Sequence, residues 1–219
     1  MPVRQIPKNY RNVTGLASAK KSKRVLFEST LERDFFTVLE FDSNVLAYDT
    51  QPVKICWTDS CGKSRSYHPD VLVSYRSSKG IFFATDTVLF EVKYRSDIKE
   101  NWLEYKPKFK AALRYAKKMG WRFKLVTECE IRTHYMENAR FLLPYMGRPL
   151  DESHEQLLLD RLVILRESSV ETLIASIFND KWNQAELIPS VWHLIGSRRI
   201  ATDLSLPLTM SSRIWLGEC

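Results

Sequence analysis

Hydrophobic and polar residues follow two different periods in the first two thirds of the chain. From Ser29-Thr30-Leu31-Glu32 to about Glu40, apolar residues recur at helical spacing, and the Ser-x-x-Glu start is typical of a capping box. From Gln51 the pattern changes to short strand-like runs separated by turn residues: QPVKICW, SRSYHPDVLVSY, IFFAT, TVLFEVKY and RFKLVT. Between the last two runs, residues 107–119 predict an amphipathic helix that ends at Gly120. A helical crossover between strands indicates an α/β fold.

The last third of the chain has a different pattern. After a predicted helix at 134–146, the segment GRPLDES marks a change in composition. We then expect three helices: one at residues 152–166, one that starts from a Ser168-x-x-Glu171 capping box, and one at residues 183–195 with or without a break at Pro189. A hairpin should follow, with residues 199–203 paired with residues 213–216. Helices followed by a hairpin predict a winged-helix-like module.

These patterns predict three parts of the chain. Residues 1–27 are basic and show no period, so we expect a flexible arm that orders on a partner, or a disordered tail. Residues 28–147 form the expected α/β domain, a mixed sheet flanked by helices. Residues 148–219 form the expected winged-helix-like domain.

Composition narrows the class of protein. The 219 residues are 44% hydrophobic, which is enough for a sizeable core. No stretch approaches the roughly 20 apolar residues of a membrane-spanning helix, and the N-terminus lacks the apolar run of a secretion signal. We therefore expect a soluble, cytoplasmic protein without a membrane partner. The four cysteines are spaced neither for zinc nor for a disulfide scaffold, which predicts buried or unused thiols.

Charge is distributed unevenly along the chain. The net formal charge is +7, but residues 151–219 hold six Lys/Arg against ten Asp/Glu, so residues 1–150 carry +11. Residues 1–27 hold seven Lys/Arg and residues 106–124 hold eight, and neither segment contains an acidic residue. A polyanionic partner such as DNA is therefore expected on the N-terminal two thirds.

The main chemical signal is a carboxylate pair with a lysine. Pro69-Asp70 precedes one apolar run, and Glu91-Val92-Lys93 closes another, with 20 residues between Asp70 and Glu91. Alternation along a strand places Glu91 and Lys93 on one face. If the two strands pair, Asp70 and Glu91 converge on one divalent ion while Lys93 reaches the same phosphate, as hydrolysis of a phosphodiester requires.

Each of these residues also has a purely structural interpretation. Pro-Asp occurs in many turns, and Glu-x-Lys on a strand is often a solvated charge pair. Glu32 completes the capping box, yet it shares a helical face with Phe35 and Leu39 and could point toward the sheet as a further ligand. A single histidine before a turn, such as His68, is more often structural than chemical.

Several of these motifs together resemble a known family. The order ESTLE, QPV, YHPDVLV, FEVK, over about residues 24–143, is similar to the PD-(D/E)xK nuclease superfamily with its restriction-endonuclease-like fold, and most closely to the TnsA family of transposon endonucleases. The resemblance implies an active site of Glu32, Asp70, Glu91 and Lys93. It also implies Mg²⁺ or Mn²⁺ held by the three acids and the main-chain carbonyl of Val92. Gln51 recurs in the family's QP element, and we interpret it as positioning or strand structure, with direct catalysis as the alternative.

The resemblance also implies how the protein works. TnsA-like nucleases cut the strand at each transposon end that a DDE-type transposase leaves uncut, and they act with that transposase and an ATP-dependent regulator. We expect double-stranded DNA at transposon ends as the substrate, at the bacterial nucleoid. The alternatives are a stand-alone restriction-type or junction-resolving nuclease and a non-catalytic winged-helix DNA-binding protein. Three acids beside a bound phosphate disfavour the last unless a metal intervenes.

Overall fold

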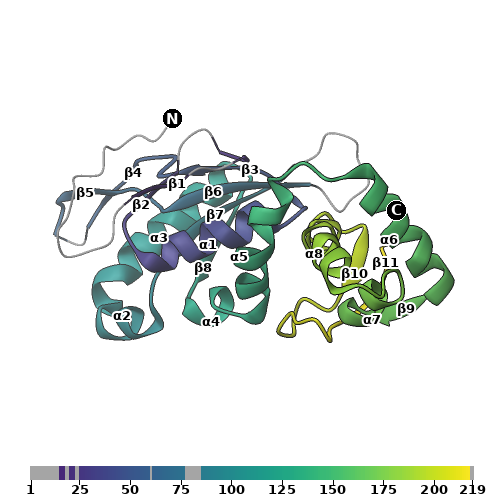
Figure 1. The fold of residues 1–219 in the computed structure, drawn as a ribbon. Helices are drawn as coiled ribbons and strands as arrows, with labels where there is room; N and C mark the ends of the chain where they lie inside the picture. Colours follow the sequence, from purple (N-terminus) through teal and green to yellow (C-terminus); the bar gives the residue numbers. More distant parts are fainter. Residues whose placement is uncertain (1–14, 18–19, 23–24, 60, 77–84, 218–219) are drawn as a thin grey trace. The chain divides into compact units, whose positions relative to one another are not determined.

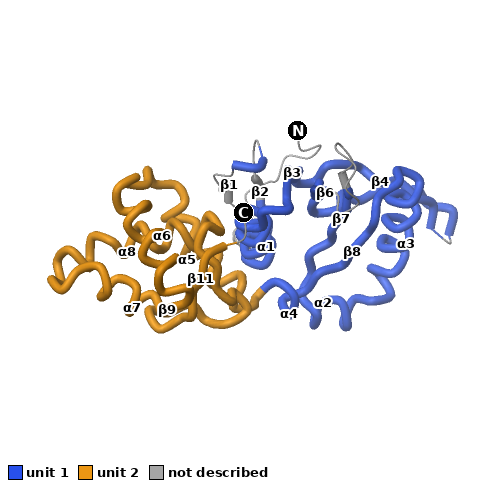
Figure 2. Tube along the Cα trace, turned by 90° about the vertical axis from the view of Figure 1, so that its right-hand side faces the viewer, with its two compact units in different colours: residues 1–131 blue, residues 132–219 orange. Residues whose placement is uncertain are grey.

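The computed structural model describes residues 15–17, 20–22, 25–59, 61–76 and 85–217. The chain forms two compact units, residues 1–131 and 132–219, which Figure 2 colours separately. The sequence-based domain boundary at residue 147 lies one helix further along the chain. No helix within the described ranges is both long and apolar enough to cross a membrane.

A four-stranded mixed sheet forms the centre of unit 1 (Figure 1). Its strand order is β3-β6-β7-β8, in which β6 pairs antiparallel with β3 and β7, and β8 pairs parallel with β7. The elements of this unit are β1 (Gly15–Ala17), β2 (Val25–Phe27), α1 (Thr30–Phe41), β3 (Val45–Thr50), β4 (Ile55–Thr58), β5 (Ser64–Tyr67), β6 (Val71–Arg76), β7 (Thr85–Val92), α2 (Arg95–Glu100), α3 (Trp102–Lys118), β8 (Arg122–Val126) and α4 (Glu128–Ile131). The predicted α/β sheet flanked by helices is confirmed.

Helices α1 and α3 cover opposite faces of the sheet. Val88 and Phe90 of β7 pack in the core cluster that contains the buried face of α1, whereas Leu89 packs with Ala112 of α3. Successive residues of a strand point to opposite faces, so the residues of β7 alternate between the α1 side and the α3 side of the sheet. Glu91 therefore shares the α3 side with Leu89.

Sequence periodicity located most elements of unit 1, but β3 and the start of α3 differ from the prediction. Strand β3 was missed, because it is bulged and partly polar and its buried residues, Val45, Tyr48 and Thr50, do not follow a strict two-residue period. Helix α3 begins at Trp102 rather than at Pro107, and the proline is accommodated inside the helix. Its predicted stop is confirmed, since Gly120 has a φ of +74°.

The N-terminal arm lies largely outside the described residues. Its described part differs from the expectation of no regular structure, because β1 and β2 form an antiparallel pair with Leu16 opposite Leu26. Lys21 also donates from Nζ to the carbonyl oxygens of Leu39, at 2.9 Å, and Asp42. The predicted strand IFFAT lies outside the described residues apart from Thr85. Cys56, Cys61 and Cys129 are free and exposed rather than buried.

Unit 2 combines four helices with a small antiparallel sheet of order β10-β11-β9. Its elements are α5 (His134–Met146), α6 (Glu152–Leu165), β9 (Glu167–Ser169), α7 (Val170–Ala175), α8 (Lys181–Gly196), β10 (Ile200–Thr202) and β11 (Arg213–Leu216). The predicted helices and the terminal hairpin are confirmed. Helix α8 continues through Pro189, with Leu187 and Val191 buried on either side. The cap of α7 is Ser169 rather than Ser168, because the Ser169 hydroxyl oxygen accepts from the backbone N–H of Thr172.

Candidate active site

Strand pairing brings Asp70 beside Glu91. The β6–β7 register ends at Val71 opposite Phe90, so Asp70, which precedes β6, lies alongside the next residue of β7. The backbone N–H of Val92 donates to Asp70 Oδ2 at 2.7 Å, which fixes the carboxylate against the end of β7. The expected pairing of these two strands is confirmed.

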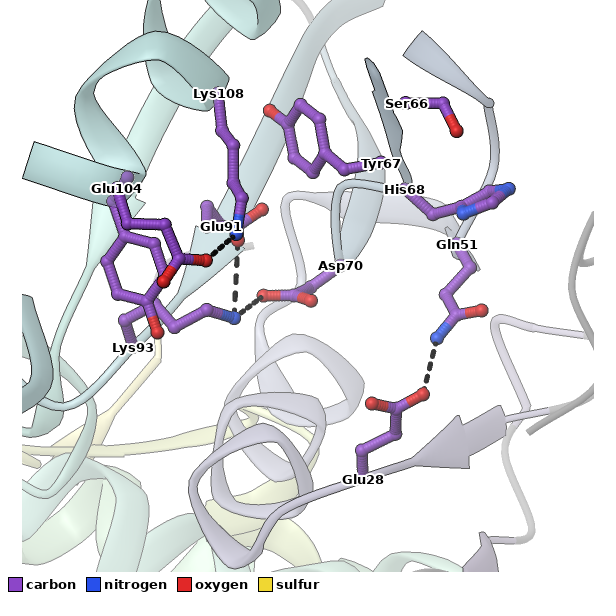
Figure 3. Close-up of a pocket in the computed structure, with 11 residues that line it drawn as sticks. Glu28, Gln51, Ser66, Tyr67, His68, Asp70, Glu91, Lys93, Glu104 and Lys108 are labelled. Carbon is purple, nitrogen blue, oxygen red and sulfur yellow. Dashed lines mark hydrogen bonds and ion pairs between the residues drawn. The ribbon is translucent and has the colours of Figure 1, made fainter. Parts of the chain in front are cut away.

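Lys93 lies at the centre of this group. Its Nζ is 3.3 Å from Asp70 Oδ2 and 3.2 Å from Glu91 Oε1 (Figure 3). The same atom is 3.1 Å from the carbonyl oxygen of Val92. Glu91 and Lys93 thus share one side of the strand, as alternation predicts. Two carboxylates and one carbonyl converge on a single cationic atom.

Burial perturbs the charges of this group. Burial and the neighbouring Asp70 carboxylate raise the pKa of Glu91 to about 8, against the opposing effect of Lys93 and Lys108. Its side chain is only 5% exposed, and its Oε2 has no hydrogen-bond partner among the described residues. Burial opposes the charge of Lys93, but the carboxylates of Asp70, Glu91 and Glu32 outweigh it and raise the pKa of Lys93 above its usual value. Perturbed titratable groups in a cleft are typical of functional sites.

Glu32 is held by the capping box of α1. Its carboxylate accepts from the backbone N–H of Glu28 at 2.9 Å and from the Ser29 hydroxyl at 3.1 Å, while Ser29 Oγ accepts from the N–H of Glu32. Burial, and then Asp70, raise the pKa of Glu32 to about 7, and the charge of Lys93 opposes the rise. The predicted cap of α1 by Ser29 is confirmed, whereas the Glu32 carboxylate accepts from the backbone N–H of Glu28, and its carboxyl also interacts electrostatically with the site. Its role as a metal ligand stays a prediction.

The site opens into a pocket of about 470 Å³. Three of the predicted residues line it, namely Asp70, Glu91 and Lys93, and Glu32 does not. The other lining residues are Glu28, Gln51, Ser66, Tyr67, His68, Glu104, Tyr105 and Lys108. Sequence analysis named only Gln51 and His68 of these. The acid-free segment 106–124 contained Lys108, but its period did not indicate which lysine faces the site.

Tyr67 and α3 form one wall of the pocket (Figure 3). The Tyr67 hydroxyl is buried without a hydrogen-bond partner among the described residues, and burial together with Glu91 and Asp70 raises the pKa of this phenol. Lys108 Nζ binds Glu104 Oε1 at 2.6 Å and lies 5.0 Å from the centre of the Tyr105 ring. This wall therefore adds a second cation to the pocket.

The acidic side chains of this site do not by themselves form a cluster of metal ligands in the part of the chain that the structure describes. Within the described ranges, no group of three or more His, Cys, Asp or Glu side chains has a geometry that could hold a metal ion. The carboxylates of Asp70 and Glu91 are instead joined through the ammonium group of Lys93. A metal ion bound by these carboxylates would need a main-chain oxygen as a further ligand, or it would have to displace that ammonium group.

A mixed sheet flanked by helices, with two carboxylates and a lysine at the ends of two adjacent strands, defines an α/β protein with a charged candidate site. A comparison with known families identifies the chain. Residues 42–128 match the family TnsA-like endonuclease N terminal, and residues 130–204 match TnsA endonuclease C terminal. The chain belongs to the TnsA family, as its motifs predicted, and the family implies a nuclease that takes part in transposition. A comparison with curated proteins found no match.

Proposed function

We propose that this chain is the metal-dependent endonuclease subunit of a transposase. It hydrolyses the non-transferred (5′) strand of double-stranded DNA at transposon ends. A DDE-type transposase cuts the other strand, and an ATP-dependent regulator controls the assembly. Family membership supports nuclease chemistry and transposition, and the resemblance of the motifs supports the choice of strand.

One observation carries the proposal. Asp70 Oδ2, Glu91 Oε1 and the Val92 carbonyl oxygen surround one ammonium group within 3.3 Å. Hard oxygen donors of this kind are what Mg²⁺ and Mn²⁺ prefer. A second oxygen of Glu91, Oε2, is buried without a partner among the described residues, so the site has unused donor capacity. These residues fit a divalent cation in the place that the ammonium group takes.

The residues then divide the chemistry of hydrolysis. Asp70, Glu91 and the Val92 carbonyl would hold Mg²⁺, with Glu32 as a further ligand, and the bound cation supplies charge neutralisation of the phosphate and activation of water. Lys93, released from the carboxylates, would contact the phosphate and stabilise the charge that develops on it. The carboxylates of Asp70, Glu91 and Glu32 keep Lys93 positively charged for this role.

Charge supports a division of labour between the units. Residues 1–131 hold 24 Lys/Arg and 15 Asp/Glu, a net +9, whereas residues 132–219 hold nine and 11, a net −2. Phosphate neutralisation and counterion release dominate DNA binding, so unit 1 is the expected DNA-binding part. Unit 2, with its helices and terminal hairpin, is the proposed winged-helix-like module and the expected contact for protein partners.

Cleavage of end-labelled transposon-end DNA by the full chain in the assembled system tests the proposal. Asp70→Asn should lower Mg²⁺-dependent cutting of the 5′ strand by about 100-fold or more, because it removes a ligand charge without removing volume. Asp86→Asn, on β7 but outside the pocket, is the matched control and should cut normally. Normal cutting by Asp70→Asn would refute the metal site.

A further inference from the structure

Gln51 has an unusual backbone and an unusual environment for a glutamine. It follows β3 with a φ of +47°, in the left-handed region that residues with a side chain rarely adopt. It is only 7% exposed, and its Oε1 is buried without a hydrogen-bond partner among the described residues. Both features cost stability, and such costs are concentrated at functional sites.

Three hydrogen bonds link Asp70, which precedes β6, to Glu32 of α1 by way of Gln51. Its backbone N–H donates to the carbonyl oxygen of Asp70 at 2.8 Å. Its side-chain Nε2 donates to Glu28 Oε1 at 3.0 Å, as Figure 3 shows. The backbone N–H of Glu28 in turn donates to Glu32 Oε2 at 2.9 Å. A continuous path of hydrogen bonds therefore runs from Asp70 through Gln51 and Glu28 to Glu32.

The chemistry of this path requires a hydrogen-bond donor at position 51, which the amide of Gln51 supplies. The carboxylate of Glu28 can only accept, so the NH₂ group of Gln51 must face it. A carboxylate at position 51 would repel Glu28, and an apolar side chain would leave the link open. Asparagine tolerates the left-handed backbone better than glutamine, but it is one methylene too short to reach Glu28 in the same way.

We propose that Gln51 is a positioning residue for the nuclease site. It holds the segment before α1, and with it Glu32, at a set distance from Asp70 before β6. The left-handed backbone of Gln51 directs its main-chain N–H to Asp70 while its side chain reaches Glu28. This inference rests on the proposed function, because it assigns the residue a role in aligning two acids for one cation.

The test compares the full chain with its Gln51→Asn and Gln51→Gly variants. Both replacements suit a positive φ, so the melting temperature should stay the same or rise. Mn²⁺ affinity, measured by electron paramagnetic resonance, and the kcat for strand cleavage should fall about 10- to 100-fold, as for other residues that orient metal ligands. The affinity for DNA should not change. Gln156→Asn, on α6, is the matched control and should behave like the wild type.

A double-mutant cycle makes the test specific. Glu28→Ala removes the partner of the Gln51 amide, so Gln51→Asn combined with Glu28→Ala should lower Mn²⁺ affinity no more than either change alone. Independent, additive losses would overturn the proposal, as would wild-type Mn²⁺ binding and cleavage by Gln51→Asn or Gln51→Gly. If the wild type itself neither binds Mn²⁺ nor cuts DNA, the proposed function fails before this inference is reached.

Discussion

At the scale of single residues, the carboxylates of the candidate site lie close enough to repel one another. Glu91 and Glu32 have raised pKa values because they are buried beside Asp70, and the positive charge of Lys93 only partly compensates. A protein without bound cation is therefore destabilised when these carboxyls ionise. Placing acids close together is unfavourable for the folded state but favourable for binding a divalent cation.

The pH dependence of stability tests this repulsion. The pKa of Glu91 rises from an ordinary 4.5 to about 8 on folding, so its stabilising contribution is complete below about pH 4.5 and is lost as pH rises through about 8. Glu91→Gln cannot ionise. In EDTA, its melting temperature should match the wild type near pH 5 and exceed it near pH 9, by about 2–4 °C for each kcal/mol.

Added Mg²⁺ should reverse the difference in melting temperature between the wild type and Glu91→Gln near pH 9. In Mg²⁺ the wild type should gain stability by binding, whereas Glu91→Gln should gain little because it lacks a ligand charge. The measurement is thermal unfolding at both pH values with and without Mg²⁺. A melting-temperature difference that does not vary with pH would contradict the raised pKa of Glu91.

At the scale of elements, the start of α1 combines a helix cap with a candidate ligand. Ser29 Oγ accepts from the backbone N–H of Glu32, and the carboxylate of Glu32 accepts from the backbone N–H of Glu28. The carboxyl of Glu32 also interacts with Asp70 and Lys93. The two roles can be separated by substitution. Glutamine at position 32 keeps a capping oxygen but loses the charge, whereas alanine at position 29 removes the cap and keeps the carboxyl.

Glu32→Gln should therefore abolish cleavage with little loss of melting temperature. Ser29→Ala should lower stability by about 1 kcal/mol and retain most of the cleavage. Thermal unfolding and strand cleavage of the two full-length variants provide the comparison. If Glu32→Gln cuts normally at an unchanged melting temperature, Glu32 is only a cap.

Helix α3 presents its lysines to different surroundings. Lys108 lines the pocket, and its charge acts on Glu91, whereas Lys106 and Lys110 on the same helix are exposed and do not line it. Lys108→Ala should lower cleavage about tenfold or more, because a cation beside the phosphate is lost. Lys106→Ala and Lys110→Ala make the same change in charge and should affect only salt-dependent DNA affinity. Equal cleavage by all three variants would remove Lys108 from the site.

At the scale of the whole molecule, α5 belongs to the second unit. Asn138 on α5 is buried, donates to the carbonyl oxygens of Leu204 and Leu206, and accepts from the N–H of Leu208. His193 Nδ1 on α8 also lies 3.0 Å from the carbonyl oxygen of Tyr145. These contacts explain why the chain divides at residues 131 and 132 rather than after residue 147.

Two truncated proteins test this division. Residues 132–219 should unfold cooperatively, because they retain their core and the hydrogen bonds of Asn138. Residues 148–219 should not, because deletion of Met136, Ala139 and Leu142 opens a core in which a single leucine is worth about 2–5 kcal/mol. Circular dichroism during heating distinguishes them. Equal cooperative transitions would place α5 outside the second unit.

Local sequence determined most of the elements and the candidate chemistry of this protein. Strand alternation located Glu91 and Lys93 on one side of β7, the Ser29-x-x-Glu32 pattern located the start of α1, and Gly120 located the end of α3. These features depend on spacing within one segment. The family also followed from motifs, since their order along the chain was sufficient.

Tertiary structure decided what depends on contacts between distant segments. No local pattern indicates that Lys93 joins Asp70 to Glu91, that Lys108 faces the pocket, or that Gln51 has a positive φ. Membership of α5 in unit 2 depends on hydrogen bonds to residues more than 60 positions away. The physical reason is that backbone preferences and periodicity act over a few residues, whereas burial, pKa shifts and strain arise from neighbours that only folding brings together.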